Sequence, residues 1–104
     1  MTIKKANKKE TTKYVVVRTQ NAGVFAGNLF LVGKEEVVLK NVRRIWYWKG
    51  AASLSQLAME GVTCPNECKF SMPVENQHLF QVIEIIDTTK KAEANIKAVP
   101  EWKA

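Results

Sequence analysis

Residues 13–32, KYVVVRTQNAGVFAGNLFLV, carry the clearest structural signal in the chain. Residues 13–19 are rich in β-branched side chains, and this composition predicts a strand. Residues 20–23, QNAG, favour a tight turn, because Asn and Gly tolerate a positive φ. Residues 24–32 then form the returning strand, and Gly27 within it indicates a β-bulge or a close approach of another backbone. The stretch therefore predicts an antiparallel hairpin.

The strand pattern continues beyond this hairpin. Gly33 and Lys34 close a second tight turn, residues 35–40 form a third strand, Asn41 marks a turn or kink, and residues 42–49 form a fourth strand. Consecutive strands of this kind favour a locally connected meander. A further strand is expected at residues 77–87, QHLFQVIEIID. Because this segment is apolar on both faces, it is expected at the centre of the sheet.

Two helices are predicted from their capping residues. Ser53 with Gln56 forms a capping-box pattern, and Gly61 suits the position after the last turn, so a short helix lies between them. Thr88 or Thr89 caps a C-terminal helix. The apolar side of that helix comprises Ala92, Ile96 and Val99, and Pro100 ends it. The expected fold is α+β: an antiparallel β-meander of about five strands with one short central helix and a C-terminal helix.

Length and charge define the domain organisation. A chain of 104 residues suits one domain. Residues 1–13 contain five lysines and one glutamate, so they carry +4 of the net charge of +6. We therefore expect a disordered basic tail at residues 1–12 and a single α+β domain at residues 13–104. No apolar run reaches ~18 residues and the N-terminus has no apolar signal region, so no membrane association and a cytoplasmic location are expected.

Catalytic and metal chemistry have little support in the sequence. Cys64 and Cys68, in CPNEC, lack further ligands nearby, since the single histidine, His78, lies ten residues on. We expect both cysteines to be small apolar residues, with no metal and no cofactor. His78 is expected to be a packed or edge residue and not a general base. Glu84 is either a candidate acid, if it is buried, or a carboxylate paired with an arginine. The chain is not expected to be an enzyme.

Residues 41–50, NVRRIWYWKG, combine arginines with aromatic residues. Strand alternation puts Arg43 on one face and Arg44, Trp46 and Trp48 on the other. The tryptophans are either core or interface residues, or a platform on which a nucleobase stacks while arginine binds phosphate. The start of the short helix adds main-chain N–H groups for an anion. The candidate ligand-binding residues are Arg18, Thr19, Arg43, Arg44, Trp46, Trp48, Ser53 and Ser55.

Four segments resemble a family of short uncharacterised phage and prophage proteins. They are YVVVRTQNAGVFAG, LKNVRRIWYWKGAASLSQLA, VIEII and the terminal VPEW, and the resemblance extends over residues 13–102. The chain departs from the family pattern at Gln20-Asn21, where a Tyr-Ser type pair is expected. The resemblance implies a phage accessory protein in the host cytosol and does not imply a mechanism.

In that context the expected function is binding without catalysis. A homo-oligomer would bind and sequester a small nucleotide-like ligand, a host antiviral immune signal, through the candidate residues. One alternative is a nucleic-acid-binding accessory protein that uses residues 1–13 and the same arginines. Another is an inhibitor that binds a host protein directly through the aromatic strand.

Overall fold

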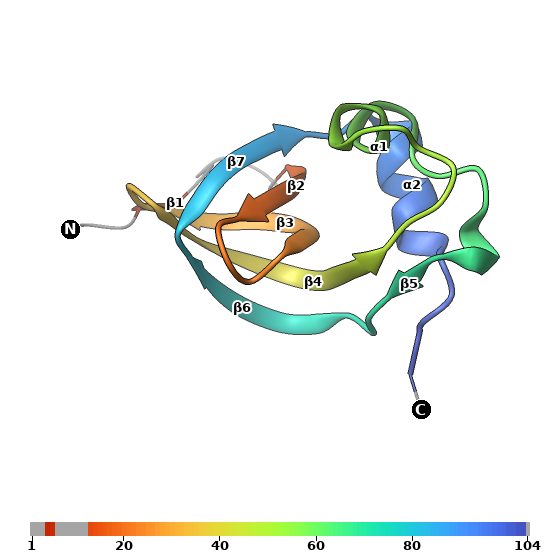
Figure 1. Ribbon diagram of the computed structural model, residues 1–104. Coiled ribbons are helices and arrows are strands. Elements are labelled where there is room, and N and C mark those ends of the chain that lie inside the picture. Colours follow the sequence, from red (N-terminus) through yellow and green to blue (C-terminus); the bar gives the residue numbers. More distant parts are fainter. Residues whose placement is uncertain (1–3, 6–12, 104) are drawn as a thin grey trace.

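The computed structural model describes residues 4–5 and 13–103. Its strands form one antiparallel sheet in the order β5-β4-β3-β2-β7, with β6 also paired to β4 and β1 to β3 (Figure 1). The elements are β1 (Lys4–Lys5), β2 (Tyr14–Thr19), β3 (Val24–Val32), β4 (Glu36–Tyr47), α1 (Leu54–Glu60), the 3₁₀ turn η1 (Pro65–Glu67), β5 (Lys69–Phe70), β6 (Val74–Phe80), β7 (Val82–Asp87) and α2 (Lys90–Ala98). The predicted α+β class, with a short central helix and a C-terminal helix, is confirmed.

The predicted hairpin is formed by β2 and β3. Tyr14 pairs with Asn28 at one end of the ladder and Arg18 with Val24 at the other. The Thr19 side chain closes the turn: its hydroxyl donates to the Gly23 carbonyl at 2.9 Å and accepts from the Ala22 N–H at 3.0 Å. Of the predicted basic tail, Lys4–Lys5 form β1 beside the end of β3, and residues 1–3 and 6–12 lie outside the described residues.

The third and fourth predicted strands are one continuous strand, β4, and the separation expected at Asn41 is wrong. Asn41 adopts a positive φ of 49° within β4, so the predicted kink is present without ending the strand. The ladder with β3 shifts register between Ala26 and Asn28, on either side of Gly27. A Cβ atom on Gly27 would lie 3.0 Å from the Cα of Val42. A side chain at position 27 would crowd the Val42 backbone, so the close approach of β3 and β4 favours glycine, as the sequence indicated.

The strand predicted at residues 77–87 is two strands, and its central position is wrong. The chain turns at Gln81, which has a φ of 58°, and β6 pairs with β4 while β7 pairs with β2. The carbonyl of Gln81 accepts from the N–H of Gln20 at 2.9 Å, and the N–H of Val82 donates to Glu35 at 3.0 Å. At Gln81 the chain thus leaves the strand paired with β4 and begins the strand paired with β2. This connection accompanies the curling of the sheet toward a barrel (Figure 1).

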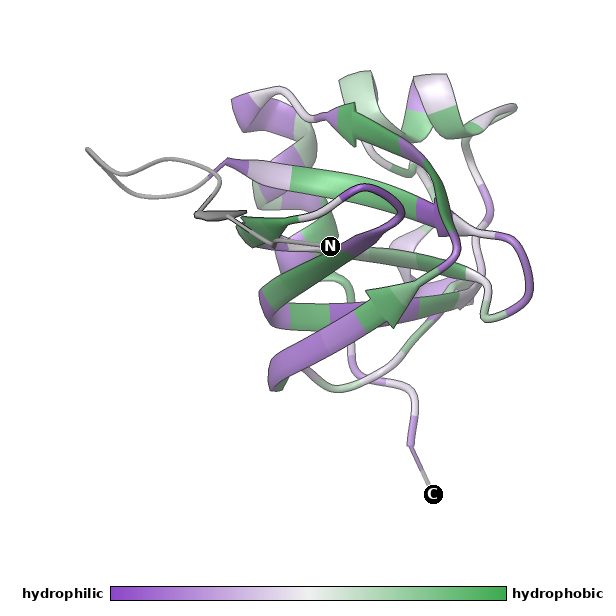
Figure 2. Ribbon diagram, turned by 90° about the vertical axis from the view of Figure 1, so that its left-hand side faces the viewer, coloured by the Kyte–Doolittle hydropathy of each residue, from purple (hydrophilic) through white to green (hydrophobic). Residues whose placement is uncertain are grey.

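Two apolar clusters lie on the two faces of this curled sheet. Tyr14 and Val16 point to the helix side, where they pack with Leu57 of α1 and Ile96 of α2. Val15 alternates with them and packs inside the curl. The other residues of that inner cluster are Val17, Phe25, Leu29, Val37, Leu39, Val42 and Leu79. β2 is therefore buried on both faces, and Figure 2 shows long hydrophobic stretches along the strands.

Both helices begin at the predicted caps. The Ser53 hydroxyl accepts from the Gln56 N–H at 3.1 Å, and the Gln56 side chain in turn accepts from Ala52 at 2.6 Å. Gly61 ends α1 with a φ of 79°, and Thr89 caps α2. The two helices lie together at one end of the sheet (Figure 1). In the part of the chain that the structure describes, no helix is long and apolar enough to cross a membrane.

Candidate functional site

Arg44 and Trp46 lie together on β4. The guanidinium carbon of Arg44 is 4.8 Å from the centroid of the Phe25 ring and 5.3 Å from that of Trp46. The Trp46 side chain is largely in solvent, with 59% of its surface exposed. The Arg44 main chain is fixed by Ser71, whose hydroxyl accepts from the Arg44 N–H at 2.8 Å. The structure thus brings two of the predicted ligand-binding residues into contact at the surface.

The Arg44 guanidinium has an N–H group without an acceptor among the described residues. Among the described residues, its Nε is buried and has no hydrogen-bond partner. A buried donor without a partner is rare in folded proteins and calls for an explanation. Here the cation lies near two aromatic rings, which stabilise the charge but do not accept its N–H groups in the manner of a carbonyl or phosphate.

Arg43 points to the opposite face and is a structural residue. Its Nε donates to the Ser71 carbonyl at 2.8 Å and its Nη1 to the Ile96 carbonyl, in α2, at 2.8 Å. Its Nη2 reaches the carbonyls of Phe70 at 3.5 Å and Pro100 at 3.4 Å. Burial lowers the pKa of Arg43, and nearby Tyr14 opposes that shift. Arg43 therefore joins β4 to the end of α2 and does not face a ligand bound at Arg44.

The other predicted residues are dispersed. Thr19 is buried and engaged in the β2–β3 turn. Trp48 lies beyond the end of β4, so strand alternation no longer applies, and it packs against the helix-side cluster. Ser53 caps α1, and Ser55 is exposed in its first turn. The structure does not gather the eight predicted residues into one pocket.

The residues considered for acid–base chemistry each contact another polar side chain. Glu84 accepts from the Nε of Arg18 at 2.9 Å, which confirms the interpretation of Glu84 as a carboxylate paired with an arginine. The Nε2 of His78 lies 2.7 Å from a carboxylate oxygen of Glu36, and its ring stacks on Phe80 with 4.5 Å between centroids. His78 is exposed on β6, as expected for an edge residue.

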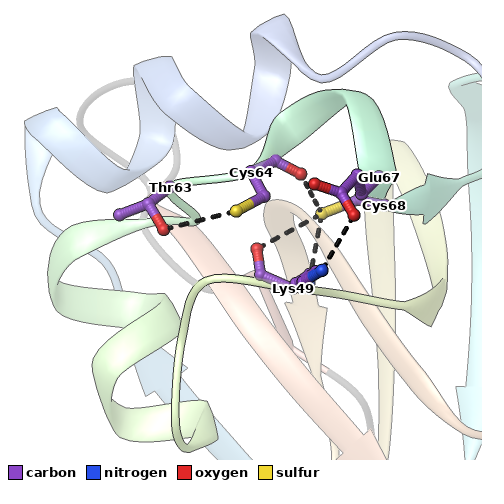
Figure 3. Close-up of polar contacts among 5 residues, drawn as sticks. All are labelled: Lys49, Thr63, Cys64, Glu67 and Cys68. Atoms are coloured by element: carbon purple, nitrogen blue, oxygen red, sulfur yellow. Dashed lines mark hydrogen bonds and ion pairs between the residues drawn. The ribbon is translucent and has the colours of Figure 1, made fainter.

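The two cysteines tie the η1 turn to the end of β4 (Figure 3). The buried Cys68 sulfur accepts from the Lys49 N–H at 3.3 Å and lies 3.4 Å from the Cys64 carbonyl. Burial raises the pKa of the Cys68 thiol, and the Lys49–Glu67 ion pair, at 2.9 Å, lies beside it. Among the described residues, no three histidine, cysteine or acidic side chains form a metal-binding group. These contacts indicate a structural part for Cys68.

A surface pocket of about 290 Å³ lies beside Arg43. Its lining comprises Tyr14, Asn41, Arg43, Pro73 and Lys97. Of these five, Arg43 alone was predicted from the sequence to bind a ligand, because β2, β4, α2 and the residues before β6 are far apart in the chain. One signal was available: Tyr14 opens a strand of valines, and a tyrosine in such a buried position needs a partner for its hydroxyl.

Comparison with known proteins gives one match. Residues 12–96 match the family described as Domain of unknown function (DUF6948). No curated protein and no solved structure matches the chain. The matched segment is most of the chain and nearly the whole of the described domain, which confirms the resemblance to an uncharacterised family and leaves a phage origin as a proposal. The chain belongs to the DUF6948 family.

Proposed function

We propose that the protein is a non-enzymatic binding protein that sequesters a small nucleotide-like ligand. The observation that supports this is the contact between Arg44 and the exposed Trp46, 5.3 Å from the guanidinium carbon to the ring. The resemblance of residues 13–102 to phage and prophage proteins supports a role for this binding in countering host defence. In that context the ligand is a host antiviral immune signal, and the protein acts in the host cytosol.

Each residue has a defined part in this proposal. The free surface of Trp46 stacks on a nucleobase, a contact worth about 1–3 kcal/mol per base. Arg44 supplies a planar cation beside it, suited to a phosphate group. Phe25 below the guanidinium and Ser71 beside the main chain hold Arg44 in place before the ligand arrives. Such preorganisation lowers the entropic cost of binding.

Calorimetric titration with mononucleotides, cyclic nucleotides and cyclic dinucleotides tests the proposal. Trp46→Ala and Arg44→Gln are expected to lose at least about tenfold in affinity for the ligand that binds. Trp102→Ala is the matched control, because Trp102 is also exposed and also lies near a cation, with Lys69 Nζ 5.2 Å from its ring. The control is expected to bind as the wild type does.

Native mass spectrometry of freshly purified protein identifies a ligand that the panel lacks. A phosphate-bearing small molecule, released on denaturation, supports the proposal. Protein that carries no ligand and binds no nucleotide contradicts it. Binding that falls steeply with salt and disappears when residues 1–13 are removed supports the nucleic-acid alternative instead.

A second candidate function is direct binding to a host protein. The observation that favours it is the exposure of large apolar side chains where β6 meets β7, among them Phe80, Ile83 and Ile85. Large apolar side chains in solvent favour a protein interaction site. A defined complex with one host protein that nucleotides do not displace would support this alternative. The same exposed apolar side chains also favour the homo-oligomer expected from the sequence, because association of two copies would bury them.

A further inference from the structure

The pocket beside Arg43 is built by three elements that are far apart in the sequence. Tyr14 comes from β2, Asn41 and Arg43 come from β4, and Lys97 comes from α2. Pro73 completes the lining just before β6. The volume of about 290 Å³ is near the lower end for ligand pockets, so it suits one small group.

Tyr14 lines this pocket and carries a buried hydroxyl that the protein itself leaves unused. The residue is 3% exposed, and among the described residues its hydroxyl has no hydrogen-bond partner. Burial raises the pKa of Tyr14 to about 12, so the phenol is protonated at neutral pH and is available as a donor. A buried hydroxyl without a partner destabilises the folded state, and an acceptor supplied by a ligand would remove that penalty.

The charged groups of the lining are cationic. Arg43 directs its hydrogen bonds to main-chain carbonyls, and these occupy four of its five N–H groups. Lys97 lies with its Nζ 5.1 Å from the centroid of the Tyr14 ring. Its ion pair with Glu93, at 2.6 Å, is on the surface of α2, and exposed pairs of this kind exchange partners at little cost. The lining thus offers one neutral donor and two cations.

We propose that this pocket binds a small oxyanion, a carboxylate or a phosphate group. One oxygen of the anion accepts from the Tyr14 hydroxyl, and Arg43 and Lys97 balance its charge. The Tyr14 hydroxyl and the flexible Lys97 ammonium together provide the donors for such a group. This site is independent of the Arg44–Trp46 surface, because Arg43 and Arg44 point to opposite faces of β4.

NMR titration of the isotope-labelled protein tests the proposal. Inorganic phosphate, acetate or chloride is added at equal ionic strength, and the amide chemical shifts are measured. Saturable shifts at Tyr14, Asn41 and Lys97 are expected with phosphate or acetate and not with chloride. A response to phosphate alone identifies a phosphate site, and a response to acetate identifies a carboxylate site. No saturable shift with either anion overturns the proposal.

Tyr14→Phe removes the hydroxyl and keeps the ring. It is expected to weaken the response by about tenfold or more, because a hydrogen bond to a charged acceptor is lost. Tyr47→Phe is the matched control, since Tyr47 is exposed and outside the pocket, and it is expected to bind normally. Undiminished binding by Tyr14→Phe contradicts the proposal.

A second variant keeps the test decisive if Tyr14→Phe does not fold. Lys97→Gln removes one cation from the exposed side of α2 and is expected to weaken anion binding severalfold. Lys91→Gln, an exposed lysine on the same helix and outside the lining, is expected to bind as the wild type does. Equal binding by Lys97→Gln and Lys91→Gln contradicts the proposal.

Discussion

Arg43 and Arg44 are neighbours in β4, yet their guanidinium groups have different environments. Successive side chains of a strand point to opposite faces, so one arginine meets the end of α2 and the other meets Phe25 and Trp46. The main-chain carbonyls at a helix C-terminus lack intrahelical donors, and a cation is stabilised there. The buried position of Arg43 follows from what covers its face of the sheet and not from its residue type.

Replacing Arg43 by methionine is expected to destabilise the fold by about 3 kcal/mol or more. Arg43 is 2% exposed, and the substitution removes its hydrogen bonds to the carbonyls of Ser71 and Ile96. The Ile96 carbonyl keeps the bond from the Val99 N–H at 3.3 Å. Urea unfolding followed by circular dichroism measures the change. Arg18→Met is the control, because Arg18 is exposed and forms a surface ion pair with Glu84, and a loss below about 1 kcal/mol is expected. Equal losses in the two variants would show that the Arg43 contacts contribute little.

The stability of the protein is expected to fall between about pH 10 and about pH 12 because of Tyr14. Burial raises the pKa of Tyr14 from 10.0 to about 12. Below this window both the folded and the unfolded chain are protonated, and within it the unfolded chain loses its proton first. Unfolding is therefore favoured as the pH rises, by up to about 2–3 kcal/mol.

Urea unfolding at a series of alkaline pH values measures this loss, with Tyr14→Phe as the reference. All other titratable groups are present in both proteins, so the difference between the two curves reports on Tyr14. The free energy of unfolding of the wild type should therefore decrease more steeply than that of the variant. Parallel curves would refute the assignment of this loss to Tyr14.

The helix ends could be predicted from the sequence because their hydrogen bonds are local. Ser53 bonds to Gln56, three residues on, and Thr89 bonds to Ala92 at the same spacing. Gly61, with a φ of 79°, occupies a conformation that other residues rarely adopt. In each case the determining contacts lie within one helical turn, so the sequence pattern contains them.

The corner between β6 and β7 could not be predicted in this way. Residues 77–87 are apolar on both sides of Gln81, and this pattern alone indicates one long strand. The turn is held instead by main-chain bonds from Gln81 to Gln20 and from Val82 to Glu35. Both partners lie more than 40 residues earlier in the chain. Closure of the sheet, a property of the whole fold, overrides the local preference for a continuous strand.

Gln81→Val is expected to be less stable than Gln81→Asn by about 1–2 kcal/mol. A φ of 58° at this corner crowds a β-branched side chain, whereas Asn adopts this conformation readily. Both substitutions shorten the side chain that accepts from Asn21, so the loss of that contact is common to both. Thermal or urea unfolding compares the two proteins. Equal stability would mean that the backbone at residue 81 relaxes when it is substituted.

The whole fold determines how much of the candidate site could be inferred. Alternation along β4 correctly put Arg44 and Trp46 on one face, because that rule needs only the strand itself. The same rule placed Trp48 wrongly, because the strand ends at Tyr47 and alternation does not extend beyond it. The pocket of Tyr14 and Lys97 was out of reach, because it exists only where β2, β4 and α2 meet. Sequence patterns thus predict sites within one element and miss sites between elements.

The curled sheet also leaves a strand edge that can pair with another chain. β7 pairs with β2 along one side, and no strand among the described residues pairs with its other side. In Figure 1, β7 forms one margin of the sheet. Its exposed face carries Ile83 and Ile85 instead of the lysines or prolines that commonly protect such edges. Antiparallel pairing of β7 with a second copy would satisfy the free main-chain groups and bury these side chains.

We therefore expect the protein to self-associate through β7, with a sedimentation coefficient that rises with concentration. Ile83, which is 52% exposed, can be changed to lysine with little effect on the fold, and Ile83→Lys is expected to remain monomeric because a charged edge opposes pairing. Met72→Lys is the matched control: Met72 is 50% exposed and lies between β5 and β6, outside β7, so this variant should self-associate as the wild type does. Sedimentation velocity compares the three proteins over the same concentrations. A wild type that stays monomeric throughout excludes this assembly, and an Ile83→Lys variant that still associates places the interface on another surface.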